Sequence, residues 1–227
     1  MKKASVLISG GLDSSTLLHY VVKELGYTHV SALSFDYGQR HARELDCARA
    51  QCASLDAVVE HQVLDISYMG AFLGATSALV AGGEKVPELQ DIKESDLDQP
   101  VTYVPNRNMM LLSIAASFAE SRECSHLFYG AQAQDEYGYW DCTLEFLEKI
   151  NQVFALNRRT PVFVEAPFVS MDKGSLLKIG QDLGVNYSDT WTCYRGGEQP
   201  CEVCPSCVER ALAFEKASSL DPLLAKV

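Results

Sequence analysis

The stretch VLISGGLDSSTLL, from Val6 to Leu18, places a short apolar run directly before two glycines, an aspartate and two serines, and then resumes an apolar pattern. A buried strand that turns into a helix in this way directs backbone N–H groups and the positive end of the helix dipole at one point. Gly10 and Gly11 let a ligand approach the backbone closely, and the serine hydroxyls add hydrogen-bond donors. The stretch therefore predicts a binding site for an anion such as phosphate.

This turn matches neither of the two common nucleotide-binding turns. The P-loop requires a lysine after its last glycine, and the dinucleotide pattern requires three spaced glycines; the stretch has neither. Asp13 is a candidate ligand for Mg²⁺ or a cap for the helix that follows. The alternative interpretation is a plain Gly-rich turn in which Asp13 or Ser14 only caps the helix.

The rest of the chain alternates short apolar runs with amphipathic stretches, which predicts a parallel sheet with helices on both faces. We expect a doubly wound α/β sheet of five strands or slightly more. The expected strands are Ser5–Ile8, His29–Asp36, Ala57–Ile66, His126–Tyr129 and Val162–Ala166. The expected helices are Ser14–Leu25, Gln39–Leu55, Asn106–Ser121 with Asn106 as cap, Thr143–Leu156, Lys173–Leu183 and Cys207–Ala217.

The sequence also predicts the domain organisation of the chain. We expect residues 1–190 to form the α/β domain and residues 191–227 to form a cysteine-containing tail packed on it. The polar, acidic stretch from Ala81 to Gln99 has no periodicity and is predicted to be a long surface loop.

Composition narrows the class of protein. The net charge of −11 argues against direct nucleic-acid binding, which needs clustered Lys and Arg. No apolar run approaches the ~20 residues that span a bilayer, and the N-terminal apolar stretch is too short for a signal peptide. We expect a cytoplasmic protein without a membrane partner. Eight cysteines in a reducing compartment predict metal ligands or buried thiols rather than disulfides.

A cysteine cluster lies near the C-terminus, with the spacing C-x7-C-x2-C-x2-C. Its members are Cys193, Cys201, Cys204 and Cys207. Four thiolates this close in sequence can bind one tetrahedral Zn²⁺, and no nearby histidine suggests an open, catalytic position. The cluster therefore predicts a structural zinc site, with an iron–sulfur cluster as the alternative because C-x2-C-x2-C also occurs in ferredoxins.

SGGLDSS resembles the SGGxDS pyrophosphate loop of ATP pyrophosphatases, which cleave ATP to AMP and pyrophosphate. The segments FDYGQRH, YVPNRN, DEYGYWDCTLEF, TWTCYRGG and CPSCVERALAF narrow the resemblance to the 7-cyano-7-deazaguanine synthase family, from Val6 to Phe214. The resemblance implies a sheet of the adenine-nucleotide α-hydrolase type and a homodimer. It implies an enzyme that uses ATP and Mg²⁺ to adenylate the carboxylate of 7-carboxy-7-deazaguanine, captures it with ammonia and ends at the nitrile.

The resemblance also implies roles for individual residues. The loop that binds ATP comprises Ser9, Gly10, Gly11, Leu12, Asp13, Ser14 and Ser15. The expected catalytic residues are Asp13, Ser14, Arg107 and Lys173. The expected substrate-binding residues are Tyr37, Gln39, Arg40, His41, Arg107, Asn108, Asp135, Tyr139 and Asp141, and Asp141 is expected to pair with the guanine-like edge.

The chain departs from the family pattern in the segment that resembles the substrate loop. Trp140 stands where the family has proline, Glu136 replaces an aromatic residue, and Leu12 replaces the usual glutamine. These departures keep a second hypothesis open: an enzyme that joins the activated carboxyl to another amine, for example on a protein partner that enters at the long loop. A third hypothesis is a non-catalytic nucleotide-binding scaffold, against which the intact loop and cysteines argue. GMP and NAD synthetases share the loop but lack the cysteine tail.

Overall fold

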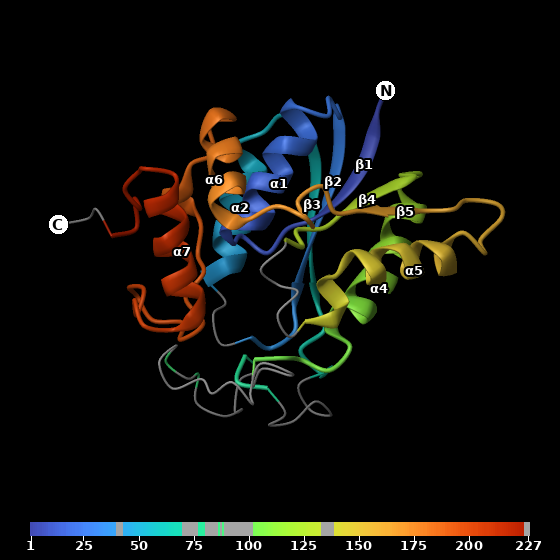
Figure 1. The fold of residues 1–227 in the computed structure, drawn as a ribbon. Helices are drawn as coiled ribbons and strands as arrows, with labels where there is room; N and C mark the ends of the chain where they lie inside the picture. The colour runs from blue at the N-terminus through green and yellow to red at the C-terminus, as the bar shows by residue number, and fades with distance from the viewer. Residues whose placement is uncertain are drawn as a thin grey trace.

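The computed structural model describes residues 1–39, 43–69, 77–79, 86, 88, 102–132 and 139–224. Within these residues, five parallel strands form one sheet in the order β3-β2-β1-β4-β5, as the alternation of apolar runs predicts (Figure 1). The strands are β1 (Lys3–Leu7), β2 (His29–Asp36), β3 (Val58–Asp65), β4 (His126–Phe128) and β5 (Phe163–Glu165). The helices are α1 (Leu12–Lys23), α2 (Arg43–Ala53), α4 (Arg107–Ser121), α5 (Leu144–Phe154), α6 (Lys173–Asp182) and α7 (Pro205–Lys216), with short 3₁₀ turns η5 (Trp140–Cys142) and η6 (Tyr187–Asp189).

Helices cover both faces of the sheet. Figure 1 shows α1, α2 and α6 on one side, with α7 outside them, and α4 and α5 on the other side. Successive strand residues point to opposite faces. Ala32 and Val30 of β2 therefore pack with α1 in one core, whereas Leu33 and Phe35 pack with α4 and α5 in the other. The central strands β1 and β2 are buried on both faces, as expected for a parallel sheet, whereas the edge strand β3 carries polar residues and is partly exposed.

The strand order places the switch point of the sheet between β1 and β4. The chain moves from β1 to β2 and β3 in one direction, and β4 and β5 lie on the other side of β1. Parallel α/β sheets bind ligands outside the carboxyl ends of their strands at such a point. The turn after β1 begins at Ile8, and the chain after β4 continues through Tyr129 and Gly130 at the same edge.

Some predicted boundaries are wrong. Gln39 forms an isolated β bridge and is not helical; the described part of α2 begins at Arg43. Asn106 occupies the cap position of α4 with φ of 54°, but its side chain makes no capping hydrogen bond. The predicted loop from Ala81 to Gln99 lies outside the described residues except for Val86 and Glu88.

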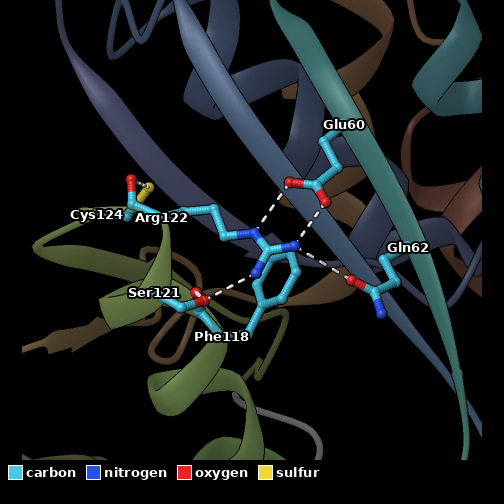
Figure 2. A network of polar contacts seen from close by, with 6 residues as sticks. All are labelled: Glu60, Gln62, Phe118, Ser121, Arg122 and Cys124. Atoms are coloured by element: carbon cyan, nitrogen blue, oxygen red, sulfur yellow. Dashed lines mark hydrogen bonds and ion pairs between the residues drawn. The ribbon is translucent and has the colours of Figure 1, made fainter.

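The end of α4 is anchored to the edge strand β3 by one arginine. The Arg122 guanidinium donates to both carboxylate oxygens of Glu60, at 3.1 and 2.7 Å, and lies over the Phe118 ring (Figure 2). It also donates to Gln62 at 3.4 Å and to the Ser121 hydroxyl at 2.8 Å. This hydrogen bonding holds the pKa of Glu60 below its usual value. The contacts fix the orientation of α4, whose opposite end carries two of the predicted site residues.

Among the residues that the structure describes, no helix has both the length and the apolar character needed to cross a bilayer.

Candidate active site

A cavity of about 580 Å³ opens at the carboxyl edge of the sheet. This volume lies within the usual range for small-molecule sites. The wall combines the turn after β1, the end of β2, the start of α4 and parts of the cysteine tail. The predicted site residues in the wall are Ser9, Gly11, Leu12, Asp13, Ser14, Tyr37, Gln39, Arg107, Asn108, Tyr139 and Lys173. Residues predicted to bind ATP and residues predicted to bind the second substrate therefore share one cavity.

The turn after β1 is ordered by its own hydroxyl groups. The Ser9 and Ser14 hydroxyls lie 3.0 Å apart, and Gly11 N–H donates to the Ser9 hydroxyl at 3.2 Å. The first intrahelical hydrogen bond runs from Ser15 N–H to the Gly11 carbonyl at 3.1 Å, so the preceding N–H groups face the cavity edge without an intrahelical partner. Gly11 caps α1, and neither Asp13 nor Ser14 is the cap. These features suit the turn to bind an anion, which stays a prediction; the turn from Ser9 to Ser15 is called the anion turn below.

Two predicted loop residues face away from the cavity. Gly10 has φ of +87°, and a Cβ atom there would lie 2.0 Å from the Glu44 carbonyl oxygen of α2. Only glycine lets α2 pack this closely on the turn. Ser15 is fully buried and does not line the cavity, so its contact with a nucleotide stays a prediction. Both residues shape the turn from behind.

Asp13, Lys173 and Glu209 form a charged group in the cavity wall. Lys173 Nζ lies 2.8 Å from Glu209 Oε2 and 3.7 Å from Asp13 Oδ2. Asp13 Oδ1 is buried and has no hydrogen-bond partner within the described part of the chain. Burial raises the pKa of Asp13, and the nearby Lys173 ammonium opposes this shift. A buried carboxylate oxygen without a partner fits the oxygen ligand set of Mg²⁺.

Arg107 and Asn108 begin α4 and both face the cavity. Burial lowers the pKa of the Arg107 guanidinium, but the neighbouring groups, led by Tyr37 and Cys142, outweigh this effect and raise it. Burial raises the pKa of Tyr37. Arg107 is therefore a permanent cation in the cavity wall.

Asp141 has a different position from the one predicted. Its side chain is 2% exposed and is absent from the cavity wall. Its Oδ2 accepts a hydrogen bond of 3.0 Å from Asn108 N–H, so it caps α4 in place of Asn106. Burial raises the pKa of Asp141, and the hydrogen bond from Asn108 opposes the shift. The geometry thus gives Asp141 a role in placing Arg107 and Asn108, and its pairing with a base edge stays a prediction.

The remaining predicted substrate residues divide into two groups. Gln39 and Tyr139 lie in the cavity wall; Gln39 Oε1 accepts from Tyr37 N–H at 2.9 Å, and the Tyr139 hydroxyl bonds to Thr102. Three others lie outside the described residues: Arg40, His41 and Asp135. Trp140, which departs from the family pattern, donates to the Tyr103 hydroxyl at 2.9 Å and does not line the cavity.

The cysteine cluster forms as its spacing predicts. The four sulfur atoms of Cys193, Cys201, Cys204 and Cys207 lie within 4.8 Å of one another. A tetrahedral Zn²⁺ with bonds of about 2.3 Å would need sulfur atoms about 3.8 Å apart. Cys204 caps α7 and Pro205 occupies its first turn, so two cluster members are held by the start of this helix. The four thiols fit one metal ion.

The cysteine tail contacts the anion turn directly. Trp191 N–H donates to the Gly10 carbonyl at 3.0 Å, and Trp191 Nε1 donates to the Cys193 carbonyl at 3.2 Å. The tail also contributes Tyr194, Ser206 and Glu209 to the cavity wall. Residues 191–224 thus complete the site, and a domain boundary at residue 190 stays a prediction.

Glu209 was not predicted to be a site residue. In the sequence it is one of several glutamates, two positions after Cys207. Its place beside Lys173 depends on how α7 packs on α6, and no local pattern signals that packing.

Comparisons with known proteins agree with this geometry. The family model for "Queuosine biosynthesis protein QueC" matches residues 3–218. This chain belongs to the QueC family. A 7-cyano-7-deazaguanine synthase from Clostridium kluyveri is 44% identical over 229 residues, covering 98% of this chain and 97% of that protein. A 7-cyano-7-deazaguanine synthase from Pseudoalteromonas atlantica is 42% identical over 223 residues, covering 98% of each.

A solved structure supports the fold of this QueC family member. The NMN synthetase from Francisella tularensis superimposes with a TM-score of 0.52 at 15% identity, covering 96% of this chain and 77% of that chain. At this level of identity the likeness concerns the fold alone. It agrees with the predicted parallel α/β sheet.

Proposed function

We propose that this protein is an ATP-dependent ligase that converts 7-carboxy-7-deazaguanine and ammonia to 7-cyano-7-deazaguanine, releasing AMP and pyrophosphate. One observation carries the proposal: the anion turn, Lys173 and the start of α4 meet in one cavity. The family membership and the names of the relatives support the substrate. That the protein forms a homodimer and is located in the cytoplasm stays a prediction.

The chemistry needs two activations. A carboxylate oxygen of the substrate attacks the α-phosphorus of ATP, and the bond to pyrophosphate breaks. Ammonia then attacks the carbonyl carbon, and AMP leaves to give the amide. A second ATP activates the amide oxygen in the same way, and loss of AMP and a proton gives the nitrile.

Residues of the turn would bind the departing pyrophosphate. The N–H groups at the start of α1 and the hydroxyls of Ser9 and Ser14 are donors at the cavity edge. Such preorganised donors stabilise charge that develops in the transition state. Lys173 adds a cation beside the turn, and Asp13 would hold Mg²⁺, which supplies further neutralisation of phosphate charge when bound.

The other end of the cavity would bind the deazaguanine. Tyr37, Arg107, Asn108 and Tyr139 supply aromatic surface, a permanent cation and an amide there. An arginine is suited to orient a carboxylate, because its planar guanidinium matches the two carboxylate oxygens. We infer that Arg107 aligns the substrate carboxylate with the α-phosphorus.

The cysteines would hold a structural Zn²⁺. The four thiolates would fill all four positions of a tetrahedral ion, which would leave no open position for catalysis. The same four thiols suit an iron–sulfur cluster, and metal analysis of the purified protein distinguishes the two. A structural ion would hold Tyr194 and Ser206 in the cavity wall.

The position of Trp140 bears on the conjugating alternative. Because this departure from the family pattern lies outside the cavity wall, it does not by itself change what the cavity accepts. The product assay described next distinguishes ammonia from another amine, for example on a protein, as the acceptor.

The test is a product assay. The protein is incubated with ATP, Mg²⁺, 7-carboxy-7-deazaguanine and ammonium, and products are analysed by mass spectrometry. We expect the nitrile together with AMP and pyrophosphate. AMP and pyrophosphate with an adenylate or amide but no nitrile would favour transfer to another amine. The absence of ATP cleavage would contradict both enzyme hypotheses and favour a scaffold.

A matched pair of variants tests the site. Lys173→Met removes one of the cations in the cavity wall, whereas Lys178→Met removes an exposed lysine from the same helix. We expect the first to lower kcat/KM for ATP by about 100-fold, the typical loss for one charge-stabilising donor, and the second to leave it unchanged. Equal activity of the two variants would contradict the assignment of Lys173.

A further inference from the structure

The first residues of α6 are placed by α7. Asp172, which caps α6, pairs with Lys216 of α7 at 2.8 Å. Gly174 packs so closely on α7 that an added Cβ would lie 2.6 Å from the Lys216 side chain. Lys173, between them, pairs with Glu209 of α7 at 2.8 Å. The cap of α6 and its first two residues therefore all contact α7.

The Lys173 ammonium lies between two carboxylates on different elements. Glu209 Oε2 accepts its hydrogen bond, and Asp13 Oδ2 lies farther away at 3.7 Å. The Lys173 side chain is 10% exposed, so its long aliphatic part is already immobilised. The hydrogen bond to Glu209 fixes where the ammonium end points relative to the anion turn.

We propose that Glu209 is a positioning residue, which holds the Lys173 ammonium beside the anion turn so that it can contact the phosphates of a bound nucleotide. The inference rests on the proposed function, because it takes Lys173 to be a phosphate ligand. Glu209 lies two residues after Cys207, within one turn of α7. The cysteine cluster, by holding the start of α7, thus also sets the position of Lys173.

The direction of the change in ATP affinity distinguishes a positioning role of Glu209 from a purely electrostatic one. Glu209 is an anion in the wall of a site for phosphates, so a purely electrostatic role would weaken ATP binding, and its removal would strengthen binding. A positioning role predicts the opposite for a variant that loses the hydrogen bond. Glu209→Leu removes both the charge and the acceptor. Glu209→Gln removes the charge but keeps an oxygen that accepts from lysine.

The experiment measures the dissociation constant of a nonhydrolysable ATP analogue with Mg²⁺ by calorimetry, and the KM for ATP and kcat in parallel. We expect Glu209→Leu to weaken analogue binding about three- to tenfold and to raise the KM for ATP similarly. Glu209→Gln should stay within about twofold of the unmodified protein, because it keeps the hydrogen bond. Glu215→Leu and Glu215→Gln, at an exposed glutamate of the same helix, are the matched controls for charge and helix stability.

A double-mutant cycle tests whether Glu209 acts through Lys173. In a Lys173→Met background, Glu209→Leu should have no further effect on analogue binding. Unchanged or tighter binding by Glu209→Leu, or a loss that persists in the Lys173→Met background, would overturn the inference. Metal content and the unfolding temperature are measured for every variant. Where the leucine variant loses its metal, Glu209→Asp replaces it, since its carboxylate stops about 1.5 Å short and should weaken binding in the same direction.

This design separates the inference from the proposed function. If the unmodified protein neither binds the analogue nor cleaves ATP, the proposed function fails. If it does both and the Glu209 variants do not differ as described, the positioning role alone fails.

Discussion

Two of the arginine–carboxylate pairs in the described part of the chain should differ sharply in their effect on stability. Arg210 of α7 donates to both oxygens of Asp221, at 2.7 and 2.9 Å, and the two side chains are 3% and 6% exposed. Arg122 makes a similar pair with Glu60, but those side chains are 33% and 36% exposed. Asp221→Asn and Glu60→Gln each remove one negative charge with little change in shape.

The magnitude follows from burial. Removing one partner of a buried pair leaves an uncompensated charge and costs about 3–5 kcal/mol. A chain of 227 residues has an unfolding entropy of about 0.48 kcal/mol/K, so the unfolding temperature of Asp221→Asn should fall by about 6–10 °C. Water solvates the charge left by Glu60→Gln, and its unfolding temperature should fall by about 2 °C or less.

The assay is thermal unfolding by circular dichroism at pH 7, on samples with equal metal content. The remaining partners of Arg210, the Thr190 hydroxyl at 2.8 Å and the Tyr187 carbonyl at 3.1 Å, do not replace a carboxylate. If Asp221→Asn unfolds at the same temperature as Glu60→Gln, the argument from burial is wrong.

Three further predictions concern the turn, a helix cap and the metal. Gly10→Ala should abolish nucleotide binding in a calorimetric titration, because its Cβ would lie 2.0 Å from the Glu44 carbonyl oxygen and the turn must move; retained affinity would refute this. Asp172→Ala should lower the free energy of unfolding by about 1 kcal/mol in urea titrations at pH 7, because the α6 cap is lost. Lys216 holds the pKa of Asp172 below its usual value, so the ionised carboxylate stabilises the fold above about pH 4. The difference in unfolding free energy between Asp172→Ala and the unmodified protein should therefore shrink as the pH falls further, and a difference that does not change with pH would contradict this. Cys204→Ser should lose the bound metal in elemental analysis and unfold at a lower temperature, whereas full metal content would exclude Cys204 as a ligand.

Most of the fold could be predicted from local patterns. Strand β2 has the predicted bounds, and α4 ends at Ser121 as predicted. The anion turn and the cysteine cluster were also predictable, because their residues lie within a few positions of one another and their chemistry depends on that spacing. Residue roles that came from the family resemblance, such as those of Tyr37 and Tyr139, agree with a place in the cavity wall, although their contacts with substrate stay predictions.

Local patterns do not reveal contacts that depend on a distant segment of the chain. The Asp141 carboxylate caps the start of α4, because a buried helix end needs an acceptor for its free N–H groups, and the pairing of Asp141 with the substrate stays a prediction. Asn106 is a residue type that commonly caps helices and occupies the cap position with φ of 54°. Its side chain nevertheless makes no capping hydrogen bond. Tertiary packing thus decided that the Asp141 carboxylate, and not the Asn106 side chain, caps the start of α4.

The sequence by itself determined the succession of strands and helices along the chain, the strand–turn–helix unit from Val6 to Leu18, and the grouping of four cysteines that could hold a metal ion. Periodicity and short-range spacing are local properties, and they persist however the elements pack. Only the tertiary structure brought Asp13, Lys173 and Glu209 together, from three helices that are far apart in the sequence. Their proximity results from the packing of α7 on α6 and of α6 on α1, in which side chains without a common sequence pattern come into contact.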